Sequence, residues 1–279
     1  MTQMTRKILV SLAHPDDETF GAGGLLAKYA SEGAEISYIC ATDGARGTIS
    51  DEILAEHGGS AEAVRYAELD CAAKVLGFKN VYKLGYCDSG MMGSEANSDP
   101  TCLWQADEEK VAAQVGEIMR EIQPQVVITF DPFGTYGHPD HIFIHRATVR
   151  AFNAIVEEGA GYRPQKLYYI ALDKWLMRLR IWQARLQGQN PRKIGKNNDI
   201  DLTEIRDNVP PVTTRIDVRA WGDAWEAAAR CHRSQLDPRQ GINRWLRRII
   251  ERSQGLQRVY PAVNSGEKIE RDIFAGVVE

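Results

Sequence analysis

Residues 8–18 read ILVSLAHPDDE, an apolar run followed at once by a turn of His, Pro and acidic residues. We predict a buried strand over 8–12 and, after the turn, a helix from about 20 to 31. Strand, turn and helix in this order are typical of an α/β protein. Since ligands in open α/β sheets bind outside the carboxyl ends of the strands, this turn is a candidate site.

The same alternation continues through the first two thirds of the chain. The patterns predict strands at 35–41, 81–84, 126–130 and 167–171, and helices at 61–76, 108–122 and 142–157. Right-handed crossovers then give a Rossmann-like α/β fold, a mostly parallel sheet flanked by helices. We predict a single domain over 1–279, with a core at 1–172 and a C-terminal elaboration at 173–279. The elaboration is expected to hold a strand at 212–218 and helices at 221–236 and 242–252.

Residues 173–200 differ from the rest of the chain in charge. They hold seven Lys or Arg and two Asp, and a helical spacing relates Trp175, Leu179, Trp182 and Leu186. This pattern is typical of a helix that packs on the core or on a second subunit, followed by a solvated basic loop. The alternative is a substrate cap over the active site that contacts a polar or anionic molecule. Both interpretations stay open, as does a homo-oligomer.

Composition excludes several classes of protein. The 279 residues carry a formal charge of −4, whereas a nucleic-acid-binding domain usually has a net basic footprint. No run approaches the ~20 apolar residues of a membrane span, and 8–13 is too short for a signal-peptide core. The five cysteines are widely spaced without a C-x-x-C pair, so we expect neither a disulfide framework nor a zinc–thiolate site. The cytoplasm is the expected location.

The turn after the first strand carries groups suited to binding a metal. His14 and Asp17, three residues apart, could both aim at one ion, and Pro15 restricts His14 to extended geometry. Asp16 is then left over as a carboxylate beside the metal. The alternative is that Asp16 or Asp17 caps the following helix.

A second turn, YGHPDH at 136–141, follows the strand predicted at 126–130. The carboxyl ends of parallel strands meet at one edge of a sheet, so the two turns are expected to converge. His141 would complete a set of two imidazoles and one carboxylate, which is the ligand set of a catalytic zinc site. His145 is expected to pack or to support the site rather than to bind metal.

The two turns together resemble the paired signatures of the LmbE-like, or PIG-L, family of zinc-dependent N-deacetylases. That family includes enzymes that deacetylate N-acetylglucosaminyl groups in mycothiol, bacillithiol and GPI-anchor biosynthesis. Weaker similarity extends to four further segments: TDGARG at 42–47, Arg65 with Glu68 and Leu69, DSGM at 88–91, and CHRSQ at 231–235. Ala45 stands where family versions carry an acidic residue, which puts specific mycothiol-pathway contacts in doubt.

The resemblance implies a role for individual residues. It implies zinc, or Fe²⁺ in its place, bound by His14, Asp17 and His141, with Asp16 as general base. Tyr136 would help to stabilise the oxyanion, and a cationic His138 would share that task or protonate the leaving amine, with Asp140 orienting it. Glu18 would support or cap the turn. Arg65 and Asp88 would hold hydroxyls of a small amino-sugar substrate, or else form a structural ion pair. For His232 we expect local packing.

These residues predict a metal-dependent hydrolase that removes an N-acetyl group from an N-acetylglucosamine-type conjugate. A thiol-conjugate amidase of the same family is the first alternative. A non-haem iron oxygenase is the second, since two His and one carboxylate also bind iron in that class. A dinucleotide-binding loop at 21–24 is disfavoured, because its glycines lack G-x-G-x-x-G spacing and follow an acidic turn.

Overall fold

The computed structural model describes residues 5–159, 161–195, 198–236 and 252–278. Within them, seven strands form one sheet in the order β3-β2-β1-β4-β5-β7-β6, and all neighbouring pairs are parallel except those of β7, which runs antiparallel to β5 and β6. The strands are β1 Lys7–Leu12, β2 Glu35–Thr42, β3 Asn80–Tyr86, β4 Val126–Thr129, β5 Lys166–Ala171, β6 Thr214–Asp217 and β7 Ser253–Tyr260.

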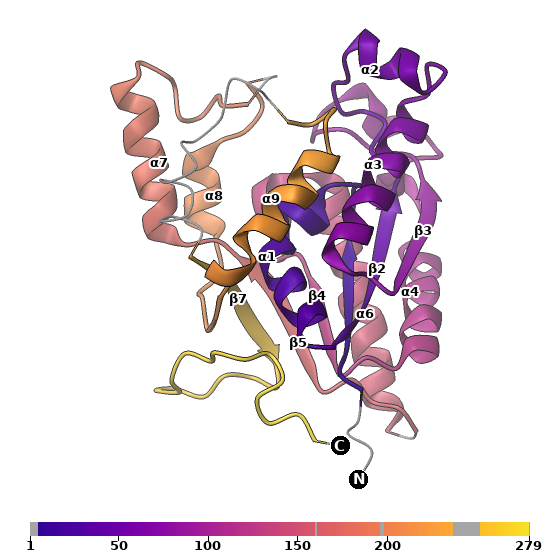
Figure 1. Ribbon diagram of the computed structural model, residues 1–279, viewed down its shortest axis with the longest axis vertical. Coiled ribbons are helices and arrows are strands. Elements are labelled where there is room, and N and C mark those ends of the chain that lie inside the picture. Colours follow the sequence, from indigo (N-terminus) through magenta and orange to yellow (C-terminus); the bar gives the residue numbers. More distant parts are fainter. Residues whose placement is uncertain (1–4, 160, 196–197, 237–251, 279) are drawn as a thin grey trace.

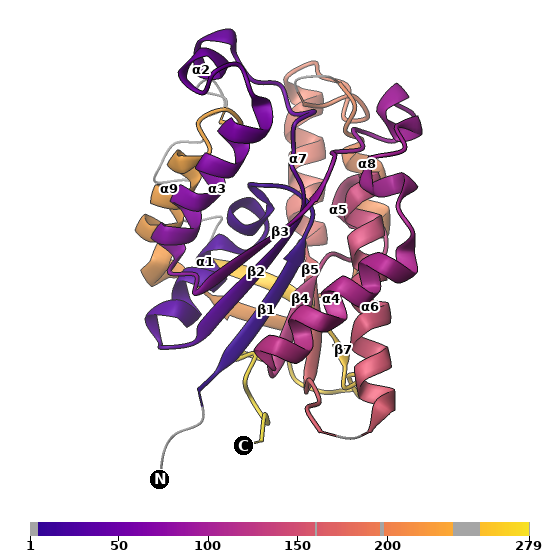
Figure 2. The same ribbon diagram turned by 90° about the vertical axis from the view of Figure 1, so that its right-hand side faces the viewer.

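Helices cover both faces of this sheet (Figures 1 and 2). Helices α1, α3 and α9 lie on one face, and α4 and α6 lie on the other. The α-helices are α1 Asp17–Ser31, α2 Asp51–Glu56, α3 Ala61–Leu76, α4 Glu108–Ile122, α5 Gly134–Gly137, α6 Pro139–Glu158, α7 Lys174–Leu186, α8 Leu202–Asn208 and α9 Gly222–Cys231. The Rossmann-like α/β fold with a C-terminal strand and helices, predicted from the sequence, is therefore confirmed.

Local signals in the sequence explain where the central elements begin and end. The Ser60 side chain accepts a hydrogen bond from Ala63 N at the start of α3, and Gly77 ends the helix in the left-handed region. The β1 side chains are buried on both sides, as expected for a strand inside a parallel sheet. These local signals predict β1 and α3 from the sequence alone.

The glycines at 21–24 serve helix packing. A Cβ atom at Gly23 would lie 2.6 Å from Trp225 Cδ1, and one at Gly24 would lie 2.9 Å from Trp225 Cε3. Without side chains at these positions, the Trp225 ring of α9 lies directly against α1, and its Nε1 donates to Thr19 O at 2.7 Å. Close contact between two helices accounts for the glycine run that had suggested a dinucleotide loop.

The C-terminal third agrees less well with the predicted elements. Helix α9 ends at Cys231, short of the expected 236, and the helix expected at 242–252 falls almost entirely within residues 237–251, outside the described part of the chain. The sequence patterns did not predict strand β7 or the short helices α2, α5 and α8. Since β7 lies between β5 and β6, the C-terminal segment belongs to the same sheet as the core.

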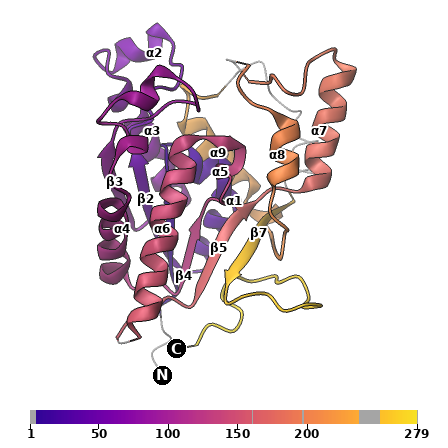
Figure 3. The ribbon, with the colours of Figure 1, turned by 180° about the vertical axis from the view of Figure 1, so that it is seen from behind.

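Of the two surfaces expected for the helix in 173–200, the core or a second subunit, Trp175, Trp182 and Leu186 do not contact the core. Their exposed fractions are 56%, 58% and 67%. Helix α7 instead buries its opposite face, Met177, Ile181 and Ala184, with Met177 packing in a cluster that includes Ile205 of α8. Figure 3 shows α7 and α8 as a pair beside the end of the sheet that holds β5 and β7.

The expectation that the cysteines form no disulfide is also wrong. Cys71 on α3 is joined to Cys231 at the end of α9, across a sequence separation of 160 residues. Two helices packed side by side bring these distant positions together, which spacing in the sequence does not reveal. Cys40, Cys87 and Cys102 are free. None of the described helices is both long enough and apolar enough to cross a membrane.

Candidate active site and metal centre

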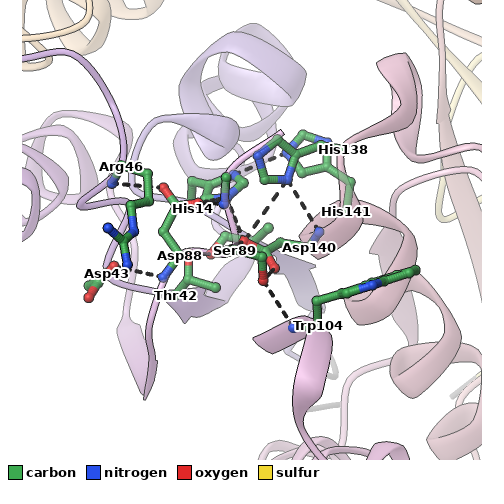
Figure 4. Close-up of polar contacts among 12 residues, drawn as sticks. His14, Thr42, Asp43, Arg46, Asp88, Ser89, Trp104, His138, Asp140 and His141 are labelled. Atoms are coloured by element: carbon green, nitrogen blue, oxygen red, sulfur yellow. Dashed lines mark hydrogen bonds and ion pairs between the residues drawn. The ribbon is translucent and has the colours of Figure 1, made fainter. Parts of the chain in front are cut away.

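The two His-Pro-Asp turns lie at the carboxyl ends of β1 and β4, which are adjacent parallel strands. The first turn connects β1 to α1, and the second runs from α5 into α6. Loops after β2 and β3 approach the same edge and bring Asp43 and Asp88 to it, as the close-up shows (Figure 4). The convergence expected from the strand order is thus present in the structure.

The backbone of the first turn is held by its own acidic side chains. His14 N donates to Asp17 Oδ2 at 2.7 Å, and Asp16 N donates to Glu18 Oε2 at 2.9 Å. Asp16 adopts a φ of 138°, an unfavourable conformation for a residue with a side chain. Its side chain makes no capping hydrogen bond to α1, so the capping alternative does not account for Asp16.

The three side chains expected to bind a metal lie together. His14 Nδ1 is 3.1 Å from His141 Nε2. The Asp17 carboxylate lies 3.3 Å from His14 Nδ1 through Oδ2 and 3.4 Å from His141 Nε2 through Oδ1. Ligand atoms bonded at about 2.0–2.2 Å to one tetrahedral zinc ion lie about 3.3–3.5 Å apart. The spacing and chemistry of these donor atoms therefore fit a single ion.

Buried carboxylates surround His14. Its Nε2 lies 3.2 Å from Asp140 Oδ2 and 3.7 Å from Asp88 Oδ1, on the side of the ring away from Asp17. Burial lowers the pKa of His14, but the neighbouring carboxylates, of which Asp88 has the largest effect, raise this pKa well above its usual value. Burial lowers the pKa of His141 to about 4. The concentration of negative charge favours a cation at this point.

Asp140, which was expected to orient His138, contacts His14 instead. Its carboxylate accepts a hydrogen bond from Ser89 N at 2.9 Å and another from Ser89 Oγ, and it lies against His14 (Figure 4). It is 4.0 Å from His138 Nδ1, too far for the expected orienting hydrogen bond. Asp140 therefore orients His14, in the way that carboxylates commonly support metal-binding imidazoles. Ser89, fully buried, was not singled out from the sequence.

His138 is also not in the expected state. Its Nδ1 accepts a hydrogen bond from Asp140 N at 3.2 Å at the start of α6, so the proton of the ring belongs on Nε2. Burial lowers the pKa of His138 well below its usual value, and the nearby His14 and His141 rings lower it further. This arrangement favours a neutral His138 ring, whereas the resemblance implied a cationic one. Ligand atoms of His14, His138 and His141 lie within 4.8 Å of one another.

Arg65 lies beneath the first turn and is buried. Its Nη2 lies 3.2 Å from Asp16 Oδ2 and also donates to Pro15 O. Burial raises the pKa of Asp16 to about 6, and Arg65 opposes that rise. These contacts give Arg65 a structural role that holds the turn, but its ionic partner is Asp16 and not the expected Asp88.

Asp88 faces the site rather than open solvent. Its carboxylate accepts hydrogen bonds from Gly90 N at 2.8 Å and Arg46 N at 3.2 Å, in addition to facing His14. The side chain is buried, with little surface left for a substrate hydroxyl. No ion pair joins Arg65 directly to Asp88 within the described residues.

Tyr136 lies on the second turn beside the histidines. Its ring centroid is 4.9 Å from that of His141 and 5.9 Å from that of His138. The Asp131 carboxylate holds the turn by accepting hydrogen bonds from Phe133 N and Thr135 N. Tyr136 also packs against the α7–α8 cluster, so the segment considered as a cap adjoins the site.

Two further buried histidines, His145 and His232, make contacts outside the cluster of His14, Asp17 and His141. His145 Nδ1 lies 2.7 Å from Phe130 O, and its ring packs on Tyr169, in line with the expected packing role. His232 Nε2 lies 2.7 Å from Glu18 Oε1, and both side chains are fully buried. This second contact joins residues 214 positions apart, so reasoning from the sequence missed it.

Comparison with known sequences places these turns in context. Residues 9–152 match the family model described as GlcNAc-PI de-N-acetylase (PIG-L). The chain is 38% identical over 245 residues to the 1D-myo-inositol 2-acetamido-2-deoxy-alpha-D-glucopyranoside deacetylase of Thermobifida fusca, covering 83% of this chain and 84% of that protein. It is 36% identical over 290 residues to the protein of the same name from Acidothermus cellulolyticus, covering 98% and 96%.

Solved structures with the same fold include enzymes of different activities. The N,N'-diacetylchitobiose deacetylase of Pyrococcus horikoshii superposes with a TM-score of 0.60 at 21% identity, covering 91% of this chain and 83% of that chain. The 4-carboxy-2-hydroxymuconate hydratase GalB of Pseudomonas putida superposes with a TM-score of 0.57 at 19% identity, covering 94% and 100%. At these identities the likeness shows the fold alone.

Proposed function

This chain belongs to the GlcNAc-PI de-N-acetylase (PIG-L) family, and from that premise we propose that it hydrolyses the N-acetyl group of an N-acetylglucosamine-type conjugate. The observation that carries the proposal is the triangle of His14, Asp17 and His141 donor atoms with the Asp16 carboxylate beside it. The sequence relatives named above are deacetylases of an inositol-linked acetamido sugar, and they match this chain over more than four fifths of their length. A small amino-sugar conjugate is therefore the substrate class we propose.

We propose that His14, Asp17 and His141 hold one divalent ion, zinc or Fe²⁺ in its place. The set leaves room for a fourth group, as catalytic sites of this type do. Such an ion supplies Lewis acidity, which polarises an amide carbonyl and lowers the pKa of water. Asp140, fixed by Ser89, keeps the His14 ring turned so that Nδ1 faces the other two donors.

Asp16 is the proposed general base. Its side chain is 19% exposed, so it can reach a reacting water, whereas Arg65 holds it from below. A carboxylate with a pKa of about 6 is well matched to accepting a proton near neutral pH, since a base works best when its pKa lies near the working pH. The proton taken up by Asp16 can then pass to the leaving amine.

His138 and Tyr136 are proposed to stabilise the negative charge that develops on the amide oxygen. With Nδ1 occupied by Asp140 N, His138 has its Nε2 proton free to donate. Tyr136 offers its hydroxyl from the same turn. Preorganised donors of this kind commonly account for 10²–10³-fold in rate. The α7–α8 segment, which packs against Tyr136, is proposed to cap the substrate side of the site within a single 1–279 domain.

Measurement of acetate release from a panel of N-acetylglucosaminides tests the proposal, with thiol conjugates included to detect an amidase. We expect turnover by metal-loaded protein, about one ion per chain by elemental analysis, and loss of at least ~10³-fold in Asp16→Asn. Asp70→Asn, an exposed carboxylate on α3 that pairs with Lys83, is the matched control. Turnover by metal-free protein, or normal turnover by Asp16→Asn, would contradict the mechanism.

A further inference from the structure

A short segment that begins with the last residue of α9, residues 231–235, is bonded to the helices beneath the first turn. Cys231 is bonded to Cys71, Ser234 donates from N and Oγ to the two Glu68 oxygens at 2.7 Å, and His232 contacts Glu18. We call this segment the strap. Its similarity to other family members was noted from the sequence, but the proposed chemistry gives it no role.

The strap reaches the proposed general base through one buried side chain. Glu18 Oε2 accepts the hydrogen bond from Asp16 N at 2.9 Å, whereas Glu18 Oε1 lies 2.7 Å from His232 Nε2 and 2.6 Å from Thr19 Oγ1. Glu18 is fully buried, and an ionised carboxylate in that position is stable only when its oxygens are paired. Thr19 is the neighbour of Glu18 on α1, so His232 is the partner from outside that helix that orients the Glu18 carboxylate.

Asp16 needs such a constraint because of its backbone. A residue with a side chain at φ 138° is strained, and this conformation persists only where surrounding contacts impose it. Among the described residues, the side chain that holds the Asp16 amide in this conformation is Glu18, whose Oε2 accepts the hydrogen bond from Asp16 N. The contact on the carboxylate side is Arg65.

The metal-binding side of the turn is held independently. Asp17 Oδ2 accepts from His14 N, and His14 is oriented from behind by Asp140. Neither contact involves the strap. The Nδ1 atom of His232 has no hydrogen-bond partner in the described part of the chain, and Nε2 has one further contact, Thr19 Oγ1 at 3.4 Å.

From these contacts we propose that His232 is a positioning residue for the reaction, which acts through Glu18 to hold Asp16 at the proton-transfer position. The proposal rests on the proposed function, in which Asp16 is the general base. The two halves of the first turn are therefore positioned by different contacts. His232 positions Asp16 through Glu18, whereas Asp140 of α6 and Ser89 of the loop after β3 position the metal ligand His14.

The test compares His232→Leu, His232→Gln and Ser234→Ala in the metal-loaded protein. Leucine fills the space but removes the donor, and glutamine restores an N–H near the position of Nε2. Ser234→Ala removes one hydrogen bond between the strap and Glu68 and leaves the contact of His232 with Glu18 in place. For His232→Leu we expect kcat to fall about 10²-fold, the effect of a misplaced catalytic group, with KM changed less than about twofold. His232→Gln should recover at least tenfold, and Ser234→Ala should retain kcat within about threefold.

Two readouts besides activity separate positioning from general damage. Metal content and affinity, measured by chelator competition, should be the same in all four proteins. Hydrogen exchange of the Asp16 amide should accelerate in His232→Leu and not in Ser234→Ala. A normal kcat in His232→Leu, an equal loss in Ser234→Ala, loss of metal in parallel with rate, or no recovery in His232→Gln would each overturn the proposal.

The same experiment distinguishes a failure of the positioning role from a failure of the proposed function. If the wild type releases no acetate from any substrate of the panel, the function is refuted, and accelerated exchange at the Asp16 amide in His232→Leu would still support the structural link. If the wild type is active and the exchange is unchanged in His232→Leu, the positioning role is refuted while the function stands.

Discussion

Opening the Cys71–Cys231 bond is expected to lower the free energy of unfolding by up to about 5 kcal/mol. The bond closes a loop of 160 residues, and the chain-entropy relation gives this value for a loop of that length at 25 °C. For a protein of 279 residues the same loss corresponds to a fall of about 8 °C in Tm. The effect arises mainly in the unfolded chain, which gains freedom when the loop is opened.

Denaturant unfolding with and without reductant measures this loss, with the Cys71→Ser/Cys231→Ser double variant as the matched control. Reductant should shift the midpoint of the wild type and leave that of the double variant unchanged. A thiol titration of the unreduced, unfolded protein should count three free cysteines, Cys40, Cys87 and Cys102. A count of five, with no effect of reductant, would refute the bond.

Three further outcomes are expected. Gly23→Ala should cost about 1–2 kcal/mol in denaturant unfolding, because the clash of the new Cβ with Trp225 outweighs the better helix propensity; equal stability would show that the ring can move. Burial lowers the pKa of His145, so the stability that its neutral ring contributes is complete above pH ~6.5 and is lost as the pH falls through the folded-state pKa. The stability of His145→Gln should therefore vary less with pH below 6.5, and parallel curves would contradict this. Chelation should lower the unfolding midpoint, and zinc at 100-fold its Kd should restore about 2.7 kcal/mol, but not in Asp17→Asn.

The parts of the fold that sequence patterns predict are those held together by local rules. Strand β1 is an unbroken apolar run, and the helix predicted at 61–76 has the bounds of α3, because Ser60 and Gly77 mark its ends. The two His-Pro-Asp turns were expected to converge because parallel strands end at one edge. Each of these inferences needs only neighbours along the chain and the geometry of a parallel sheet.

The parts that were missed depend on contacts between distant residues. Strand β7, SQGLQRVY, carries polar residues along most of its length, and only its pairing with β5 and β6 makes it a strand. Helix α7 has two apolar faces, and the sequence does not say which of them α8 will cover. The partner of Asp140 was misassigned because His138 is nearer in sequence, whereas His14 is nearer in space.

The position of β7 has a consequence for how the chain is synthesised. Every residue of β5 is buried between its neighbours β4 and β7 in the sheet. Strand β7 ends about 90 residues after β5 in the sequence. At roughly 5–20 residues per second, a translating ribosome leaves that edge of β5 without its antiparallel partner for on the order of 5–20 s. An unpaired apolar edge invites pairing between nascent chains. Yield in the cell should therefore depend on chaperones that shield this edge, and truncations that remove β7 should aggregate although the whole metal-binding edge has already been translated.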